Sequence, residues 1–208
     1  MAYSDFTTLS KVRTTFNLTI DETTRLFPDV APIEPSDYLK TTLNEFLPLA
    51  NAINTEKARS ELIIAPVLLE VRRHFSFQIG FFSGTDFNVD PKVGLSGYCD
   101  YILTASKEMY EIYAPVVTLV EAKNENIKSG LGQCIAEMVA AQRFNQQRET
   151  AIDTIYGAVT TGMIWKFLKL VNQTAFIDLD DYFIKEIDQV LGILSAPLSQ
   201  YVSNKNNL

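Results

Sequence analysis

The run Val116-Val117-Thr118-Leu119-Val120-Glu121-Ala122-Lys123 is apolar or β-branched almost throughout and ends in two charged residues. This composition predicts a buried β-strand. Alternate residues of a strand point to the same side, so Glu121 and Lys123 share one face. Val120 and Ala122 pack on the other face. Because buried charges are costly without a partner or an ion, we expect the end of this strand to be a functional site.

Asp100 lies on the preceding predicted strand, at 96–104. A carboxylate on a neighbouring strand completes an acidic pocket beside Glu121 and Lys123. Two carboxylates and a lysine around a divalent cation form a site that can hydrolyse a phosphodiester. The ordinary alternative is that Asp100 is a strand-end acid that pairs with Lys123 and has no catalytic role.

The rest of the chain alternates between helical and strand patterns. The expected helices cover 36–47, 54–75, 131–147 and 182–201, and the expected strands cover 77–82, 96–104, 116–123, 155–160, 164–171 and 175–179. Pro66 predicts either a kink in the second helix or a later true start of that helix, and 124–130 is expected to be a loop. This order predicts an α/β (α+β) fold with a central mixed β-sheet flanked by helices.

The length of 208 residues and the hydrophobic content of 47% fit a single domain over 1–208. Three prolines at 28, 32 and 35 break the early part of the chain, so we expect 1–35 to form a peripheral arm. No apolar run approaches the ~18 residues of a membrane helix, and the first residues lack a signal-peptide pattern. We therefore expect a cytoplasmic protein without a membrane segment.

The charge balance argues against a nucleic-acid partner. There are 25 acidic and 18 basic side chains, for a net charge of −7, and nucleic-acid binders usually carry a basic stripe. The candidate basic clusters are Arg72-Arg73-His74, Lys166 with Lys169, and Arg143 with Arg148. Each is explained equally well as a solvated helix end or strand surface.

Other chemistries find little support in the sequence. His74 is the single histidine, and its place beside two arginines does not favour a serine–histidine triad or a histidine-based metal site. Cys99 and Cys134 are the only cysteines, and their apolar surroundings predict buried thiols. The chain also lacks a glycine-rich nucleotide-binding loop.

With Asp100 followed by Glu121-Ala122-Lys123, and with its order of helices and strands, the chain resembles the PD-(D/E)xK nuclease superfamily. The resemblance covers most of the chain and implies the restriction-endonuclease-like fold. Within this superfamily, the chain is most similar to the nuclease domains of type I restriction motor subunits and their stand-alone bacterial relatives.

Two further residues occupy positions where the family often carries site residues. Glu61 stands where a helical acid precedes the strands, and Gln133 stands on the helix after the lysine strand. The alternatives are an exposed helix residue for Glu61 and a helix-start polar group for Gln133. The chain departs from the family at Glu137, where many relatives have tyrosine, and at Cys99, which replaces the proline before the first acid. Glu137 adds negative charge near the site and weakens the case for the usual contact of Gln133 with a phosphate.

The resemblance implies that Asp100, Glu121 and the backbone carbonyl of Ala122 bind Mg²⁺, or alternatively Mn²⁺. Glu61 would hold the same ion through a water molecule. The ion would polarise the scissile phosphate and activate a water for attack.

Lys123 would orient that water or stabilise the charge that develops on the phosphate, and Gln133 would help to hold Lys123 or the phosphate. The expected function is that of a magnesium-dependent deoxyribonuclease of restriction or defence type, acting as a homodimer on DNA. The alternatives are an inactive binding or scaffold protein that keeps the fold, and a nuclease that acts on RNA.

Overall fold

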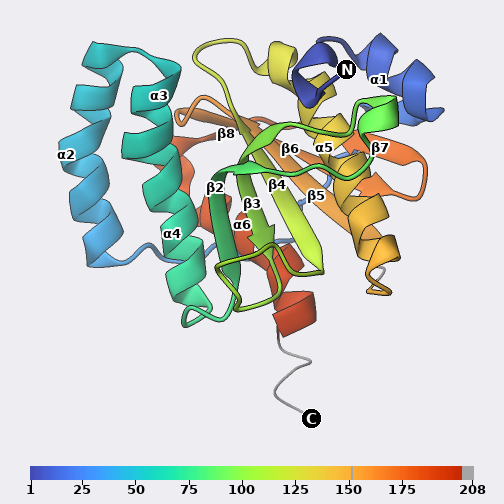
Figure 1. Ribbon diagram of the computed structural model, residues 1–208. Helices are drawn as coiled ribbons and strands as arrows, with labels where there is room; N and C mark the ends of the chain where they lie inside the picture. The colour runs from blue at the N-terminus through green and yellow to red at the C-terminus, as the bar shows by residue number, and fades with distance from the viewer. Residues whose placement is uncertain (151, 203–208) are drawn as a thin grey trace.

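The computed structural model describes residues 1–150 and 152–202, and within them an eight-stranded mixed sheet is flanked by helices (Figure 1). The strands lie in the order β1-β7-β6-β5-β4-β3-β2, and β8 pairs with β6 beside this path. The expected mixed sheet flanked by helices is therefore confirmed. Residues 151 and 203–208, which the predicted domain includes, lie outside the described part of the chain.

The helices are α1 (Leu9–Phe16), α2 (Asp37–Ile53), α3 (Glu56–Arg59), α4 (Ala65–His74), α5 (Ile127–Gln147) and α6 (Ile187–Val202). The strands are β1 (Thr19–Asp21), β2 (Gly80–Asp86), β3 (Tyr98–Thr104), β4 (Val116–Ala122), β5 (Thr154–Thr160), β6 (Ile164–Val171), β7 (Thr174–Ile177) and β8 (Tyr182–Phe183). Short 3₁₀ turns lie at Tyr3–Asp5, Pro91–Val93 and Ile184–Glu186, and a π-helical turn, Ser60–Ile64, joins α3 to α4.

Strand β4 is central because it pairs antiparallel with β3 and parallel with β5. The parallel pairing requires a crossover, and α5 supplies it. Two cores lie on the two faces of the sheet, one under α2, α4 and α6 and the other under α1 and α5. Strand β4 contributes to the first core with Val117, Val120 and Ala122 and to the second with Val116 and Leu119. Glu121 lies two residues after Leu119 on the same strand, so its side chain points to the same face of the sheet, the one that α5 covers.

The segment 1–35 is not a peripheral arm, and this prediction is corrected. Its buried side chains include Tyr3, Phe6, Val12, Leu18 and Phe27. Strand β1 also extends the sheet by pairing parallel with β7. A Cβ atom at Gly132 of α5 would collide with the backbone carbonyl of Phe6, so only glycine allows this close approach. The prolines interrupt helices here without removing the segment from the core.

Several element boundaries differ from the prediction for local reasons. Helix α5 begins at Ile127 because the Asn126 side chain caps it by accepting a hydrogen bond from the Lys128 backbone N–H at 3.0 Å. Most of the expected 124–130 loop is therefore helical. The expected helix at 182–201 begins later, because β8 and a 3₁₀ turn precede α6. Of the two alternatives at Pro66, the late helix start is the one observed: Pro66 lies in the first turn of α4, and a π-helical turn precedes it.

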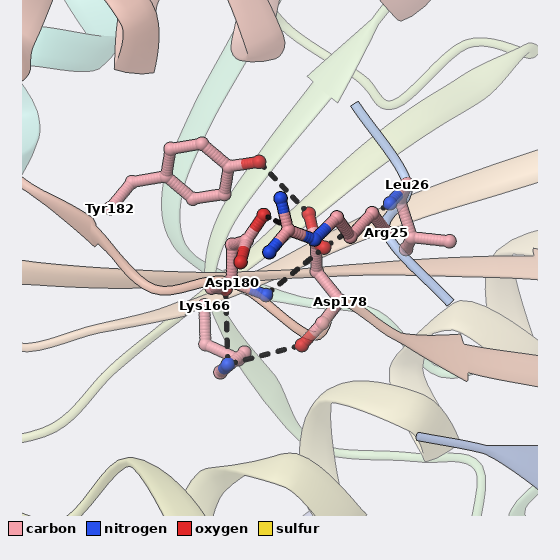
Figure 2. Close-up of polar contacts among 6 residues, drawn as sticks. All are labelled: Arg25, Leu26, Lys166, Asp178, Asp180 and Tyr182. Carbon is pink, nitrogen blue, oxygen red and sulfur yellow. Dashed lines mark hydrogen bonds and ion pairs between the residues drawn. The ribbon is translucent and has the colours of Figure 1, made fainter. Parts of the chain in front are cut away.

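The buried carboxylate of Asp178 ties an early segment of the chain to the sheet (Figure 2). Its Oδ1 accepts hydrogen bonds from the backbone N–H groups of Leu26 at 3.1 Å and Asp180 at 3.3 Å. Its Oδ2 accepts one from the Tyr182 hydroxyl at 3.2 Å. Nearby, the Lys166 ammonium donates to the backbone carbonyls of Asp178 and Asp180 at 3.0 Å. Lys166 is therefore committed to internal contacts.

None of the helices in residues 1–150 and 152–202 is both long enough and apolar enough to cross a membrane. Cys99 and Cys134 are both buried, which confirms the expectation for the two thiols. His74 is exposed at the last residue of α4, as expected for a helix-end histidine.

The substitution Asp178→Ala should lower the free energy of unfolding by about 1–3 kcal/mol, because it leaves partly buried donors without their acceptor. Urea denaturation followed by circular dichroism measures the change. The control is Asp181→Ala, which removes a half-exposed carboxylate that pairs with Lys166 at 2.6 Å and should cost less than about 1 kcal/mol. Equal losses in the two variants would contradict the structural role of Asp178.

Candidate active site

The register of β3 and β4 brings Asp100 beside Glu121. The last recorded pair of these antiparallel strands is Tyr101 with Val120, so Asp100 and Glu121 are the next positions along the two strands. The Asp100 Oδ2 atom accepts a hydrogen bond from the backbone N–H of Ala122 at 2.8 Å. This contact fixes the Asp100 carboxylate against the end of β4.

Lys123 and Glu121 form an ion pair between the lysine Nζ and the glutamate Oε1. The Glu121 side chain is 1% exposed and the Lys123 side chain is 19% exposed, so the pair is shielded from solvent on the glutamate side. The backbone N–H of Lys123 donates to the Thr160 carbonyl at 2.8 Å. A Cβ atom at Gly130 of α5 would be 2.7 Å from a Val159 side-chain carbon and 3.1 Å from the lysine Cε. The small residue therefore leaves room for both Val159 and Lys123.

Helix α5 adds a second buried acid, Glu137, which is 0% exposed. Its Oε1 accepts a hydrogen bond from the Gln133 Nε2 at 3.1 Å. The Oε2 atoms of Glu121 and Glu137 are both buried, and neither has a hydrogen-bond partner within the described residues. The two carboxyl groups interact electrostatically, each affecting the pKa of the other. Gln133 therefore contacts Glu137, which links it to Glu121 and, through Glu121, to Lys123.

Burial dominates the electrostatics of these groups. It raises the pKa of Glu137 well above its ordinary value, and the neighbouring Glu121 raises it further. Burial also raises the pKa of Glu121, with a contribution from Asp100, although Lys123 opposes the shift. For Lys123, burial disfavours the charge, but Glu121 outweighs it, and the net pKa is raised. Burial therefore favours the neutral form of Glu137, while Lys123 favours the charged form of Glu121.

Glu61 lies at the wall of a neighbouring cleft. Its side chain is 59% exposed and pairs with Lys57 at 2.8 Å. The cleft has a volume of about 320 Å³ and is lined by Glu56, Lys57, Ser60, Glu61, Ala65, Ser83, Gly84, Asp100, Tyr101 and Ala122. The π-helical turn that carries Glu61 is held on β3, because the Tyr101 hydroxyl donates to the Ser60 carbonyl at 2.9 Å. Such turns occur frequently at functional sites.

The structure thus brings Asp100, Glu121 and Lys123 together, with Gln133 one contact further away and Glu61 across the cleft. Within the described residues, no group of three or more His, Cys, Asp or Glu side chains is arranged to hold a metal ion. Mg²⁺ requires only one or two carboxylates, since water and substrate oxygens complete its shell. The carboxylate oxygens of Asp100 and Glu121 are hard ligands that fit such an ion. One of them, the Glu121 Oε2 atom, has no hydrogen-bond donor among the described residues.

Comparison with models of known protein families and with curated protein sequences gives no match to this chain. A function is therefore inferred from the side-chain arrangement. Within that arrangement, Glu137 stands out in the sequence only as a departure from a family pattern. The signal that could have found it is its spacing of four residues from Gln133, which places both on one face of a helix.

The stability of the protein in a chelator should fall as the pH rises above about 4.5, the ordinary pKa of glutamate. A carboxyl group whose folded pKa is raised binds more protons in the folded state than in the unfolded state. Its contribution is therefore full below the ordinary pKa and is lost as the pH passes the folded pKa. The slope is at most about 1.4 kcal/mol per pH unit for each group.

The variant Glu137→Gln removes one of these groups and should show a shallower decline. Urea unfolding between pH 5 and pH 8 measures both proteins. Parallel pH profiles for the two proteins would show that Glu137 is not protonated in the folded state.

Proposed function

We propose that this chain is a metal-dependent phosphodiester hydrolase, a deoxyribonuclease of restriction or defence type with the PD-(D/E)xK arrangement. The observation that carries the proposal is the convergence of three side chains where the end of β4 meets β3. Asp100 and Glu121 occupy adjacent strands, and the Lys123 ammonium contacts the Glu121 carboxylate. Burying this much charge at the end of an apolar strand is unfavourable for stability alone, which favours a functional explanation.

Asp100 and Glu121 would hold Mg²⁺ or Mn²⁺, with the backbone carbonyl of Ala122 as a third ligand and Glu61 acting through water. When bound, the ion supplies a Lewis acid for the phosphate and lowers the pKa of a water molecule. The hydrogen bond from the Ala122 N–H keeps Asp100 in place before any ion arrives. This preorganisation is what an electrostatic catalyst requires.

Lys123 carries the positive charge of the site. Its raised pKa keeps the ammonium charged at neutral pH, so it can orient a water molecule or stabilise the negative charge that develops on the phosphate. The 19% exposure of its side chain leaves part of it accessible to a substrate. Gln133 would act on Lys123 through the two glutamates.

A second candidate, an inactive binding or scaffold protein, is favoured by the acidity of the cleft. Glu56, Glu61 and Asp100 line it together with a single basic residue, Lys57, which is already paired. The net charge of −7 adds to this effect. An RNA substrate is equally compatible with the three converging side chains.

The proposal implies DNA as the substrate, a cytoplasmic location and a homodimer. The candidate basic clusters offer little help in binding DNA, because Arg143 pairs with Asp90 at 2.8 Å and Arg72 donates to the Ile79 carbonyl at 3.1 Å. A second subunit would supply a second active site for the second strand.

The substitution Lys123→Met should lower the rate of Mg²⁺- or Mn²⁺-dependent cleavage of supercoiled plasmid by about 10²–10⁴-fold, because it removes the charged group next to the phosphate. Asp100→Asn should have an effect of the same kind through the metal. The matched control is Lys40→Met, which removes an exposed lysine at the start of α2 that pairs with Glu34. Cleavage that persists in Lys123→Met would reveal a contaminant or a different site.

Light scattering coupled to size exclusion should give the mass of a dimer for the protein that linearises plasmid. Double-strand cleavage needs two active sites that act together in this proposal. A monodisperse monomer that still cuts both strands would contradict the dimer and leave the hydrolytic site untouched.

A further inference from the structure

A chain of contacts links α5 to the predicted lysine. Gln133 donates to Glu137, the carboxyl groups of Glu137 and Glu121 interact, and Glu121 pairs with Lys123. These contacts run from the helix that follows the lysine strand to the charged amine of Lys123. Each of the two glutamates has one buried oxygen, Oε2, without a hydrogen-bond partner among the described residues.

Stability does not require an acid at position 137. The side chain is completely buried on a helix whose neighbouring residues, Ala136 and Met138, are buried and apolar. Replacing a buried ionisable group by an apolar side chain of similar volume is often neutral or stabilising. A carboxyl group that costs stability and contacts a site residue is best explained by a role in that site.

We propose that Glu137 is a positioning residue of the candidate active site, which holds the Glu121 carboxylate in a fixed orientation between itself and Lys123. The inference rests on the proposed function, because Glu121 is there a metal ligand. It gives a role to the residue that departs from the family pattern.

The geometry favours positioning over direct metal binding. Glu137 is 0% exposed, and neither Glu137 nor Glu121 is among the residues that line the cleft, whereas Asp100 and Ala122 are. Complete burial keeps Glu137 away from a substrate in the cleft, so it acts on the site through Glu121. Gln133 fixes one carboxyl oxygen of Glu137 from the preceding helical turn. A side chain held in this way can restrain Glu121, which has several rotatable bonds of its own.

The role can be tested with two substitutions at the same position. Glu137→Gln keeps the shape, can donate its amide to Glu121 and can accept from Gln133. Glu137→Met keeps a similar volume but makes neither hydrogen bond. Because Glu137→Met removes a buried ionisable group, we expect its melting temperature to be equal to or higher than that of the wild type, so a loss of function cannot be attributed to unfolding.

The readouts are the Mn²⁺ dissociation constant from calorimetry, and kcat and KM for a labelled DNA duplex. Glu137→Met should lose about 10–100-fold in kcat or in Mn²⁺ affinity with little change in KM, as expected for a residue that orients a metal ligand. Glu137→Gln should stay close to the wild type. Packing alone does not explain a result in which Glu137→Gln keeps wild-type values and Glu137→Met loses them, because both side chains have a similar volume.

Three outcomes would overturn the proposal, and they are distinguishable. Wild-type values in Glu137→Met would remove the positioning role and leave the proposed hydrolase intact. Equal losses in both variants would show that the negative charge of Glu137 is needed, as for a direct ligand. A wild-type protein that neither binds Mn²⁺ nor cleaves DNA or RNA would overturn the proposed function, and the positioning role with it.

Discussion

The burial of the Glu121 carboxylate at the end of β4 is the constraint on which the site depends. A 1% exposed acid requires compensation, and two neighbours provide it from opposite sides. Lys123 supplies a positive charge from the same strand, and Glu137 supplies a carboxyl group from α5. The helix can come this close because Gly130 and Gly132 leave room for Lys123 and for the backbone of Phe6.

The same constraint connects strand register to chemistry. Asp100 faces the end of β4 because β3 and β4 pair as they do, and a slip of one residue would turn its side chain to the other face of the sheet. The Ala122 N–H then fixes the carboxylate. The parallel pairing of β4 with β5 requires the α5 crossover, which brings Glu137 over the same face. Fold and site are therefore specified by the same few pairings.

The sequence predicts the elements whose signal is local. The β-branched run before Glu121 marks a central strand, and strand periodicity places Lys123 on the same face. The role of Glu137 depends on the rotation of α5 against the sheet, which no local pattern reports. The burial of Phe6 and the contacts of Asp178 depend on partners far away in the sequence. Prolines near the N-terminus interrupt local secondary structure but carry no information about such distant contacts. The expectation that 1–35 is peripheral is wrong for this reason.

We propose that Asp100 and Glu121 together hold one divalent cation. A crystal structure of the protein soaked in Mn²⁺, with anomalous data collected near the manganese edge, tests this proposal. We expect a single strong anomalous peak within about 2.0–2.4 Å of a carboxylate oxygen of each residue. Data of equal quality with no peak between these two carboxylates, or with Mn²⁺ bound only elsewhere on the acidic surface, would contradict it.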